Sequence, residues 1–444
     1  MMFPSEFEAR MKNMLGTEYD DFFRAVSEDA AVKAAFLSPR VSEKEFFEGF
    51  SKIREKIPFC DNGYIIDCDL PGKNPMHHAG AFYVQDPSAM ATVHAAPVKS
   101  GAKILDVCAA PGGKSVQLSF KAGDGGLLIS NEVDKKRVRA LLSNVERMGL
   151  KNTIVTSLET DKLGKMYRGY FDVVLVDAPC SGEGMFRKYD VALGDWSEKK
   201  VASCAALQRK ILSDVCETVA NDGLLIYSTC TFSEEENENC VKGFLSSHPD
   251  FSPVEVNRAL LPYTHDGNGG MSFCRRFYPH IYPGEGQFFC VMRRKTEQAP
   301  EILYKSAYKK PSADEERLAR EFLRENTTAD FDIIHSSADG LRVLSSEHPV
   351  PKGAFSYGVN IGKVERGRFI AHHQLFSAYG EFFKRKIILS PESKEAALYI
   401  SGQGFACDTE NGYCAVFIGS VPIGGGKVSG GMLKNHYPKG LRMA

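Results

Sequence analysis

Apolar runs alternate with helical patterns from residue 103 to about residue 295. Five runs have the length and the Val, Ile and Leu content of buried strands; they cover residues 103–108, 126–130, 153–157, 171–180 and 223–230. Helical patterns start after Gly113, near Lys135 and near Val201, between these runs. The alternation predicts a doubly wound α/β sheet of parallel strands. Two further runs, at 251–256 and 287–293, are expected to complete it, with one strand antiparallel.

A polar stretch follows the fifth apolar run and suggests another helix. Ser233 and Glu236 have the spacing of a capping box, in which a serine hydroxyl and a glutamate carboxylate satisfy the first amide groups of a helix. We therefore predict that a helix opens at Ser233.

The N-terminal part has a different pattern. Apolar residues in 4–55 recur at helical spacing, as in Phe22, Phe23, Phe46 and Phe47, which indicates a mostly helical segment. Residues 57–80 are punctuated by Pro and Gly and are expected to be a connector. Together, residues 1–80 are expected to form a small N-terminal α+β accessory domain, ahead of a Rossmann-like catalytic domain at 81–295.

The composition shifts again after the predicted sheet. Residues 293–310 carry six Lys or Arg against two Glu, so we predict a basic linker at 296–316. Beyond it, residues 318–323 have a helical pattern, and 333–417 contain short β-like runs split by Gly and Pro. A small mixed or barrel-like domain is expected within 317–444. The tail from residue 427 carries Lys and Arg without acids and interleaves His436 and Tyr437.

Length and charge limit the classes of function. At roughly 150 residues per domain, 444 residues suggest about three domains. Because 55 Lys and Arg balance 56 Asp and Glu, any nucleic acid has to be held by local basic patches. Residues 1–15 lack a signal-peptide core, and no apolar run approaches the length of a membrane span. We expect a cytoplasmic monomer with no membrane partner. Twelve cysteines without a CxxC pair argue against a zinc site, and we expect no metal.

The first βα turn of the predicted sheet is a candidate cofactor site. It is formed by Cys108, Ala109, Ala110, Pro111, Gly112, Gly113 and Lys114. Its glycines allow a ligand to approach the backbone at a helix N-terminus, and Glu132 ends the next strand, where an acid accepts hydrogen bonds from ribose hydroxyls. The spacing of a phosphate-binding P-loop and the GxGxxG of nicotinamide enzymes are both missing. The pattern favours an adenosine-bearing cofactor.

Two thiols follow the fourth and fifth predicted strands. Cys180 comes after Asp177, and Cys230 comes after Thr229. Because ligands of open α/β sheets bind beyond the carboxyl ends of the strands, both thiols are expected beside the cofactor. Ordinary core cysteines are expected within a strand instead of at its end, and a reducing compartment disfavours a disulfide. The pair therefore indicates thiol chemistry.

These motifs resemble those of the Sun-type (Nol/Nop/Sun) RNA cytosine-C5 methyltransferases. The resemblance is carried by DVCAAPGGKS from Asp106, DAPCSGEGMFRK from Asp177, QRKIL from Gln208 and YSTCTFSEEENE from Tyr227. PSEFEARMKNMLG near the start, RRFYPHIYPGEGQFF from Arg275 and LKNHYPKGLR from Leu433 are similar to the bacterial small-subunit methyltransferase F branch. That branch implies a C-terminal PUA-like RNA-binding region.

The resemblance implies a role for each site residue. Cys230 is implied as the nucleophile that adds to cytosine C6, and Cys180 as the residue that helps the adduct break down. Asp177 is implied at the N3 and 4-amino edge of the base and beside the methionine end of the cofactor. S-adenosylmethionine is implied as the cofactor, held by the residues from Cys108 to Lys114 and by Glu132. For the adenine contact, Glu159 is favoured over Asp161.

Several alternatives stay open at this point. Lys114 either favours a thiolate or is solvated, and Arg187 and Lys188 either contact RNA phosphate or lie in a solvated loop. The expected function is methylation of cytosine C5 in ribosomal RNA, with 16S rRNA of the small subunit as the expected substrate. The alternatives are a tRNA cytosine-C5 methyltransferase and a non-catalytic RNA-binding factor in ribosome assembly. The basic linker and the basic tail are candidates for RNA contact.

Overall fold

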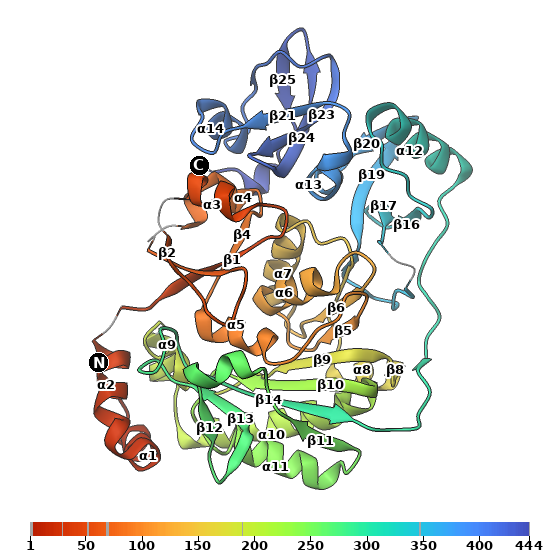
Figure 1. Cartoon of the computed structure of the whole chain (residues 1–444). Coiled ribbons are helices and arrows are strands. Elements are labelled where there is room, and N and C mark those ends of the chain that lie inside the picture. Colours follow the sequence, from red (N-terminus) through yellow and green to blue (C-terminus); the bar gives the residue numbers. More distant parts are fainter. Residues whose placement is uncertain are drawn as a thin grey trace.

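The structure is a computed structural model that describes residues 3–28, 30–50, 53–67, 71–188, 190–345 and 348–443. A ten-stranded sheet forms the centre of the lower half of the molecule in Figure 1. Five of its strands are parallel and confirm the five predicted runs: β5 (Lys103–Asp106), β6 (Leu127–Asn131), β7 (Thr153–Thr156), β9 (Phe171–Asp177) and β10 (Val219–Thr229). The others are β14 (Gln287–Arg294), antiparallel to β10, then β11 (Phe251–Val254), β12 (His265–Gly267), β13 (Met271–Phe277) and β18 (Ser356–Tyr357). The strand order is β12-β13-β14-β10-β9-β5-β6-β7-β18, and β11 pairs with β14.

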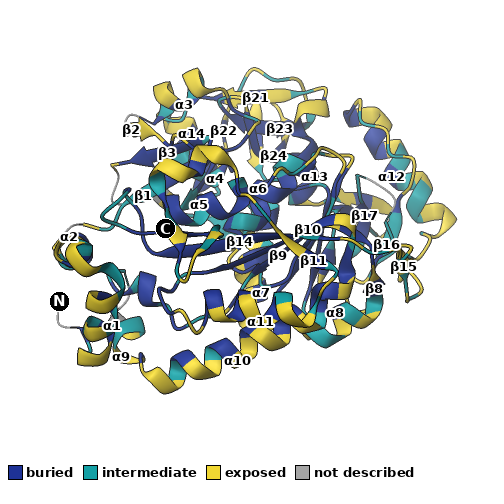
Figure 2. Ribbon diagram, turned by 60° about the horizontal axis from the view of Figure 1, so that its bottom comes forward, coloured by how far each residue is buried: buried dark blue, intermediate teal, exposed yellow. Residues whose placement is uncertain are grey.

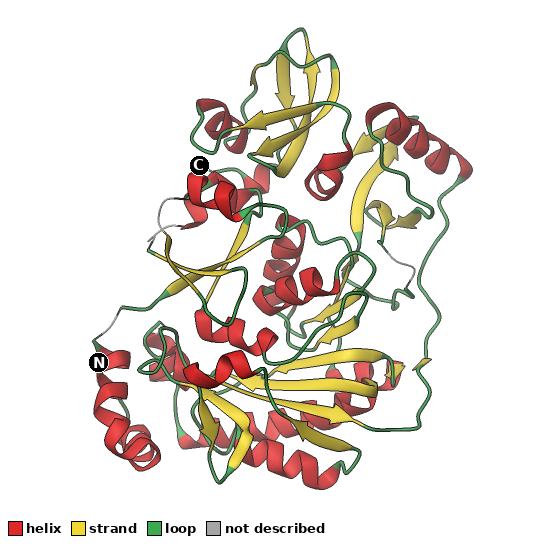
Figure 3. Cartoon of the chain, viewed as in Figure 1, coloured by secondary structure: helices red, strands yellow, loops and turns green. Residues whose placement is uncertain are grey.

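Helices cover both faces of this sheet. One face carries α5 (Pro87–His94), α6 (Gly113–Ala122) and α7 (Lys135–Arg147), and the other carries α8 (Thr160–Met166), α10 (Glu198–Val215) and α11 (Glu238–Ser247) (Figure 3). The strand residues alternate between the two cores: Ile104 packs in the first and Leu105 in the second. Burial on both faces explains why the parallel strands are continuous apolar runs. In Figure 2, the central strands are dark blue and the outer face of α10 is yellow.

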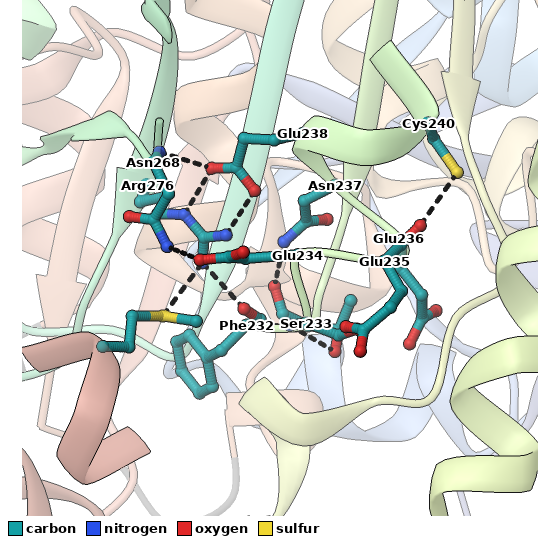
Figure 4. A network of polar contacts seen from close by, with 12 residues as sticks. Phe232, Ser233, Glu234, Glu235, Glu236, Asn237, Glu238, Cys240, Asn268 and Arg276 are labelled. Atoms are coloured by element: carbon teal, nitrogen blue, oxygen red, sulfur yellow. Dashed lines mark hydrogen bonds and ion pairs between the residues drawn. The ribbon is translucent and has the colours of Figure 1, made fainter. Parts of the chain in front are cut away.

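The helix predicted to open at Ser233 is wrong, because α11 begins at Glu238. The Ser233 hydroxyl donates to Glu235, and the Glu236 carboxylate accepts from the Ser181 amide. Figure 4 shows this segment as an irregular turn, with Arg276 reaching toward the Glu238 carboxylate and the Phe232 carbonyl oxygen. Tertiary partners thus take the groups that a capping box needs.

The N-terminal part contains a four-stranded antiparallel sheet of order β2-β3-β1-β4. Its strands are β1 (Lys33–Leu37), β2 (Ile53–Lys56), β3 (Gly63–Ile66) and β4 (Phe82–Gln85), and its helices are α1 (Ser5–Leu15), α2 (Tyr19–Ser27), α3 (Glu43–Gly49) and α4 (Pro75–His78). The expectation of a mostly helical segment at 4–55 is confirmed by α1, α2 and α3 but misses β1 and β2, and the connector expected at 57–80 is wrong, because β3 and α4 lie there. The strand β1 is rich in Ala and buried on both faces, so it has no amphipathic alternation that would distinguish it from a helix.

The first two helices pack against the loops that follow β9 and β10. Phe7 of α1 contacts Phe186 and Trp196, with ring centroids 5.1 and 5.9 Å apart, and Phe22 of α2 contacts Phe232 at 5.2 Å. The short helix α9 (Asp190–Gly194) lies in the same loop region. The N-terminal helices thereby brace the segments that carry the two candidate thiols.

The C-terminal part contains two further sheets. The first has the order β16-β17-β19-β20, and the second has the order β21-β23-β24-β25-β22. The first set is β16 (His335–Ser337), β17 (Gly340–Val343), β19 (Val359–Glu365) and β20 (Arg368–Ala371), with α12 (Ala313–Asn326) and α13 (His373–Tyr379). The second set is β21 (Lys386–Leu389), β22 (Phe405–Ala406), β23 (Gly412–Ile418), β24 (Val421–Ser429) and β25 (Met432–Asn435), with α14 (Lys394–Ile400).

The stretch expected to be a basic linker is partly structured. Its strand β15 (Glu301–Ile302) pairs with β8 (Tyr167–Arg168), and α12 begins at Ala313. Ser312 and Glu315 form a complete capping box at the start of α12.

Arg40 ties the three parts of the chain together. Its Nη2 donates to the Met148 carbonyl oxygen at 2.8 Å, and its Nη1 donates to the Ser377 carbonyl oxygen at 2.9 Å. The Ser420 hydroxyl donates to the Arg40 carbonyl oxygen at 3.0 Å. One residue of the N-terminal part thus contacts the central sheet region and both C-terminal units.

We expect Arg40→Met to destabilise the protein by roughly 1.5–3 kcal/mol, because charge-assisted hydrogen bonds to two carbonyl groups are lost. Thermal unfolding followed by circular dichroism measures the effect as a lowered Tm. Arg54→Met is the matched control, because Arg54 is an exposed arginine of β2. Equal Tm values for the two variants are the result that contradicts the role of Arg40.

Candidate active site

The loops that follow β9 and β10 bring the two predicted thiols together at the carboxyl edge of the sheet. Cys180 Sγ lies 3.1 Å from Cys230 Sγ. The loops are tied by a hydrogen bond from the Gly184 amide to the Cys230 carbonyl oxygen at 2.9 Å. The hydroxyls of Ser181 and Thr231 lie 2.8 Å apart. The sequence therefore places a fixed pair of thiols at the end of two adjacent parallel strands.

The surroundings of Cys180 favour its neutral thiol form. The contact with Cys230, followed by burial, raises the pKa of the Cys180 thiol well above its ordinary value. Cys180 is therefore neutral near pH 7, and its S–H can donate toward Cys230 Sγ. Such a donor stabilises negative charge on the sulfur that it faces.

An ion pair stands beside the thiols. Lys114 Nζ lies 2.7 Å from Asp177 Oδ2, and the Lys114 side chain is 11% exposed. Burial opposes the charge of Lys114, but the Asp177 carboxylate outweighs it and raises the pKa of the lysine. Asp177 Oδ1 accepts from the Ser228 hydroxyl at 2.6 Å. Lys114 is thus a fixed cation inside the site, and the solvated alternative for it is wrong.

A cavity of about 560 Å³ opens in front of the predicted cofactor turn. Residues of the turn from Cys108 to Lys114, together with Asp106 and Asp177, form one wall, and residues 31–33 and 83–86 of the N-terminal part form another. Gly112 has a φ of 116°, which favours glycine, and a Cβ on Gly113 would lie 2.9 Å from the Gln85 side chain. Neither position of the turn therefore has room for a side chain without a shift of its neighbours.

Two buried carboxylates lie at the ends of neighbouring strands: Asp106 ends β5 and lines the cavity, whereas Glu132 follows β6 and is not among the described residues that line it. Within the described part of the chain, Asp106 Oδ1 and Glu132 Oε2 are buried and make no hydrogen bond, although Arg137 lies 3.2 Å from the latter. Burial raises the pKa of Asp106 to about 7. These oxygens fit the hydroxyl and amino donors of an adenosine cofactor. Asp106 is not among the site residues predicted from the sequence, because there it is only the last residue of an apolar strand.

Neither candidate for the adenine contact is among the described residues that line the cavity. Glu159 is exposed at the start of α8, and Asp161 pairs with Lys165 at 2.9 Å. Asn131 fixes the preceding turn, since its side chain bonds both the amide and the carbonyl oxygen of Leu158.

Arg187 and Lys188 do not lie in a solvated loop. Arg187 pairs with Glu285 at 3.0 Å, and Lys188 pairs with Asp86 at 2.7 Å. The Asp86 carboxylate also accepts from the amide of Glu285 at 3.2 Å. Both cations thus join the thiol loop to the N-terminal part and to the segment before β14, and contact with RNA phosphate remains a prediction for them. Asp86 is not among the site residues predicted from the sequence, although it lies at the end of a strand, directly before Pro87.

The basic segments differ in how much charge they leave exposed. At the end of β14, just before the predicted linker, Arg293 and Lys295 face Asp222, and Arg294 pairs with Asp250 at 2.8 Å. In the tail, Lys434 and Lys427 are directly paired across β25 and β24, and Tyr413 is the next residue of that row on β23. Both lysines are exposed.

The part of the chain that the structure describes contains neither a metal cluster nor a membrane-spanning helix. No three His, Cys, Asp or Glu side chains there gather in a way that would hold a metal ion. No helix among those residues is long and apolar enough to cross a membrane. The eleven cysteines within it are free thiols, and Cys68 lies outside the described residues.

Three family models match successive parts of the chain. The model described as the N-terminal domain of 16S rRNA methyltransferase RsmF matches residues 3–87. The model of 16S rRNA methyltransferase RsmB/F matches residues 93–293, and that of the methyltransferase RsmF PUA domain matches residues 386–443. Both thiols and the cofactor turn lie within the second match.

Relatives of known name give the same result. The chain is 32% identical over 312 residues to the ribosomal RNA small subunit methyltransferase F of Escherichia coli strain K12, covering 68% of this chain and 65% of that protein. It is 33% identical over 299 residues to the protein of the same name from Serratia proteamaculans, covering 65% and 62%. The chain thus matches somewhat less than two thirds of the length of these relatives.

Solved structures share the fold. The crystal structure of PH0851 has a TM-score of 0.61 and 26% identity, over 66% of each chain. The structure of NSun6 from Pyrococcus horikoshii with SFG has a TM-score of 0.57 and 21% identity, over 66% of this chain and 99% of that one. The Rossmann-like architecture is therefore confirmed.

Proposed function

Because the chain belongs to the RsmB/F family of 16S rRNA methyltransferases, we propose that it methylates cytosine C5 in 16S rRNA with S-adenosylmethionine as the methyl donor. The observation that carries this proposal is the pair of thiols, 3.1 Å apart, beside a partly buried Lys114–Asp177 ion pair and a glycine turn. C5 of cytosine is a poor nucleophile, and addition of a thiolate to C6 makes it reactive.

The cofactor fits the cavity that the turn from Cys108 to Lys114 borders. When bound, S-adenosylmethionine supplies an electrophilic methyl group. Residues 108–111, Gly113 and Lys114 of the turn line the cavity, and Asp106 and Glu132 offer the cofactor's hydroxyl and amino groups carboxylate oxygens that accept no hydrogen bond from the described residues. Glu159 remains the proposed adenine contact, since it follows the turn that Asn131 fixes.

The residues around the base have separate tasks. Cys230 attacks C6, and Asp177 binds the N3 and 4-amino edge, where its carboxylate stabilises the proton on N3 that makes the ring electrophilic. Lys114 holds Asp177 in place and keeps positive charge beside the thiols. Cys180 assists the final release of the methylated base from Cys230.

The domain division follows from the same proposal. An accessory domain at 1–80 and a catalytic domain at 81–295 are followed by a linker at 296–316 and an RNA-binding region at 317–444. The family matches to residues 3–87, 93–293 and 386–443 support three such regions, and the pairing of β4 with β1 moves the first boundary from residue 80 to after β4. The target base has to leave its stack to reach Cys230, so RNA contacts outside the catalytic domain are needed.

Tritiated methyl transfer tests the function. The wild-type protein is incubated with unmodified 16S rRNA, with assembled small subunits and with tRNA, and the methylated position is mapped as 5-methylcytosine. Incorporation only into tRNA identifies a tRNA methyltransferase. Tight RNA binding with no incorporation into any substrate identifies a non-catalytic assembly factor.

We expect the double variant Lys427→Ala/Lys434→Ala to bind 16S rRNA about tenfold more weakly at roughly 0.1 M salt, because each lysine in contact with a phosphate releases counterions. The slope of log K against log salt should fall by about 1 for each lost contact. Filter binding across a salt series measures both quantities. Lys44→Ala/Lys242→Ala, which removes two exposed lysines elsewhere, is the control. An unchanged slope in the first variant contradicts the assignment.

A further inference from the structure

The peptide that carries Cys180 is held from both sides by residues outside its own loop. The Nε2 of Gln208, on α10, donates to the carbonyl oxygen of Pro179 at 2.9 Å. The amide of Ser181 donates to Glu236 Oε2 at 3.0 Å. The residue before Cys180 and the residue after it are therefore both fixed by side chains.

These two side chains are also bound to each other. Gln208 Nε2 donates to Glu236 Oε2 at 2.7 Å. The hydroxyl of Tyr227, on β10, lies 2.5 Å from the Glu236 carbonyl oxygen and 3.1 Å from Gln208 Oε1. All three residues are 0% exposed. The network thus joins α10, the end of β10 and the turn after it into one support under Cys180.

A purely structural role does not account well for the glutamate. Burying a carboxylate is costly unless its oxygens are hydrogen-bonded, and Glu236 Oε1 makes no hydrogen bond within the described part of the chain. Burial raises the pKa of Glu236 to about 7, so its charge is poorly compensated. A neutral acceptor such as glutamine could accept from the Ser181 amide and Gln208 without the cost of burying a charge.

The contacts of the network point instead to the thiols. It holds the two neighbours of Cys180, and Glu236 lies in the turn that begins with Cys230. The same loops are joined by the Ser181–Thr231 hydroxyl contact and by the bond from the Gly184 amide to the Cys230 carbonyl oxygen. The distance between the two sulfurs therefore depends on this support.

We propose that Gln208 and Glu236 are positioning residues for Cys180, which hold its thiol against Cys230 and so set the rate at which methylated RNA is released. The proposal rests on the proposed function. In the release step, a base takes the proton from C5 of the adduct, the C5–H electron pair forms the C5=C6 double bond, and the C6–S bond breaks to return Cys230 as a thiolate. Neither Gln208 nor Glu236 has to touch the RNA.

The test compares Glu236→Leu with Glu236→Gln. The glutamine keeps a carbonyl oxygen that can accept from Ser181 and Gln208, whereas leucine fills the space without an acceptor. Single-turnover methylation, multiple-turnover rate and the yield of covalent RNA–protein adduct in denaturing gels are measured. We expect Glu236→Leu to retain single-turnover methylation within about threefold, to lose at least tenfold in multiple turnover and to accumulate adduct. Glu236→Gln should turn over within about threefold of wild type.

Further variants keep the inference open to refutation. Gln208→Leu should reproduce the Glu236→Leu pattern, and it replaces that variant if thermal unfolding shows Glu236→Leu to be unfolded. Glu235→Gln, in an exposed neighbouring residue, is the control and should behave as wild type. Wild-type turnover by the leucine variants overturns the proposal, as does a parallel loss of single and multiple turnover without adduct. Failure of the proposed function is distinguishable, because the wild-type protein itself would then transfer no methyl group.

Discussion

Replacing Cys230 with alanine is expected to abolish methyl transfer to RNA, with a loss of at least about 10³-fold in rate. Without the sulfur, nothing adds to C6, and C5 of the cytosine stays too weakly nucleophilic to accept a methyl group. The alanine removes one sulfur from a site whose remaining contacts, including the Lys114–Asp177 ion pair, do not involve it. RNA affinity should therefore stay within about twofold of the wild-type value.

Tritiated methyl incorporation under single-turnover conditions measures the effect, and filter binding measures RNA affinity. Cys204→Ala is the matched control, because Cys204 is another partly buried free thiol and lies on α10. Methylation by the Cys230 variant at the wild-type rate would show that the nucleophile is wrongly assigned.

The catalytic sheet was predictable because its strands are buried on both faces. Runs such as the one that became β9 are continuously apolar, and each is followed by polar residues at the edge where ligands bind. The positions of Cys180 and Cys230 at that edge follow from the strand ends alone. Their separation of 3.1 Å does not, because it depends on how the two loops are tied to each other.

Errors arose where tertiary contacts override a local pattern. Ser233 and Glu236 have the spacing of a capping box, but the Ser181 amide and Gln208 bind the Glu236 carboxylate instead. At Ser312 and Glu315, where no such contact competes, the same spacing does form a capping box. The strand β1 was missed because its Ala-rich segment has no alternation of polar and apolar residues.

Charges were the least predictable feature, because the partner of a charged side chain is usually distant in the sequence. Lys114 pairs with Asp177, 63 residues away, and Lys188 pairs with Asp86, 102 residues away. From the sequence, each of these lysines fits a solvated loop or turn equally well. In the fold, both lie at the wall of the same cavity.

Cys180→Ala should fail at the opposite end of the reaction from Cys230→Ala. The Cys230 thiol remains, so the first methyl group is transferred, but the base for the C5 proton is missing and the methylated RNA stays bound to Cys230. We expect multiple turnover to fall by at least about 10²-fold, the usual contribution of a positioned base, and covalent adduct to accumulate. Denaturing gels with labelled RNA measure the adduct.

The pKa of Cys180 adds a pH dependence to this prediction. In the free protein, contact with Cys230 and then burial raise that pKa. In the adduct the Cys230 sulfur is bonded to C6, but Cys180 is still buried, so the thiolate that can accept the C5 proton becomes more populated as the pH rises. Release by the wild-type protein should therefore accelerate with pH, and the Cys180 variant should lose this dependence. The double variant Cys180→Ala/Cys230→Ala should form no adduct, which assigns the covalent bond to Cys230. Rapid turnover by Cys180→Ala without adduct would remove Cys180 from the release step and leave the second thiol without a chemical role.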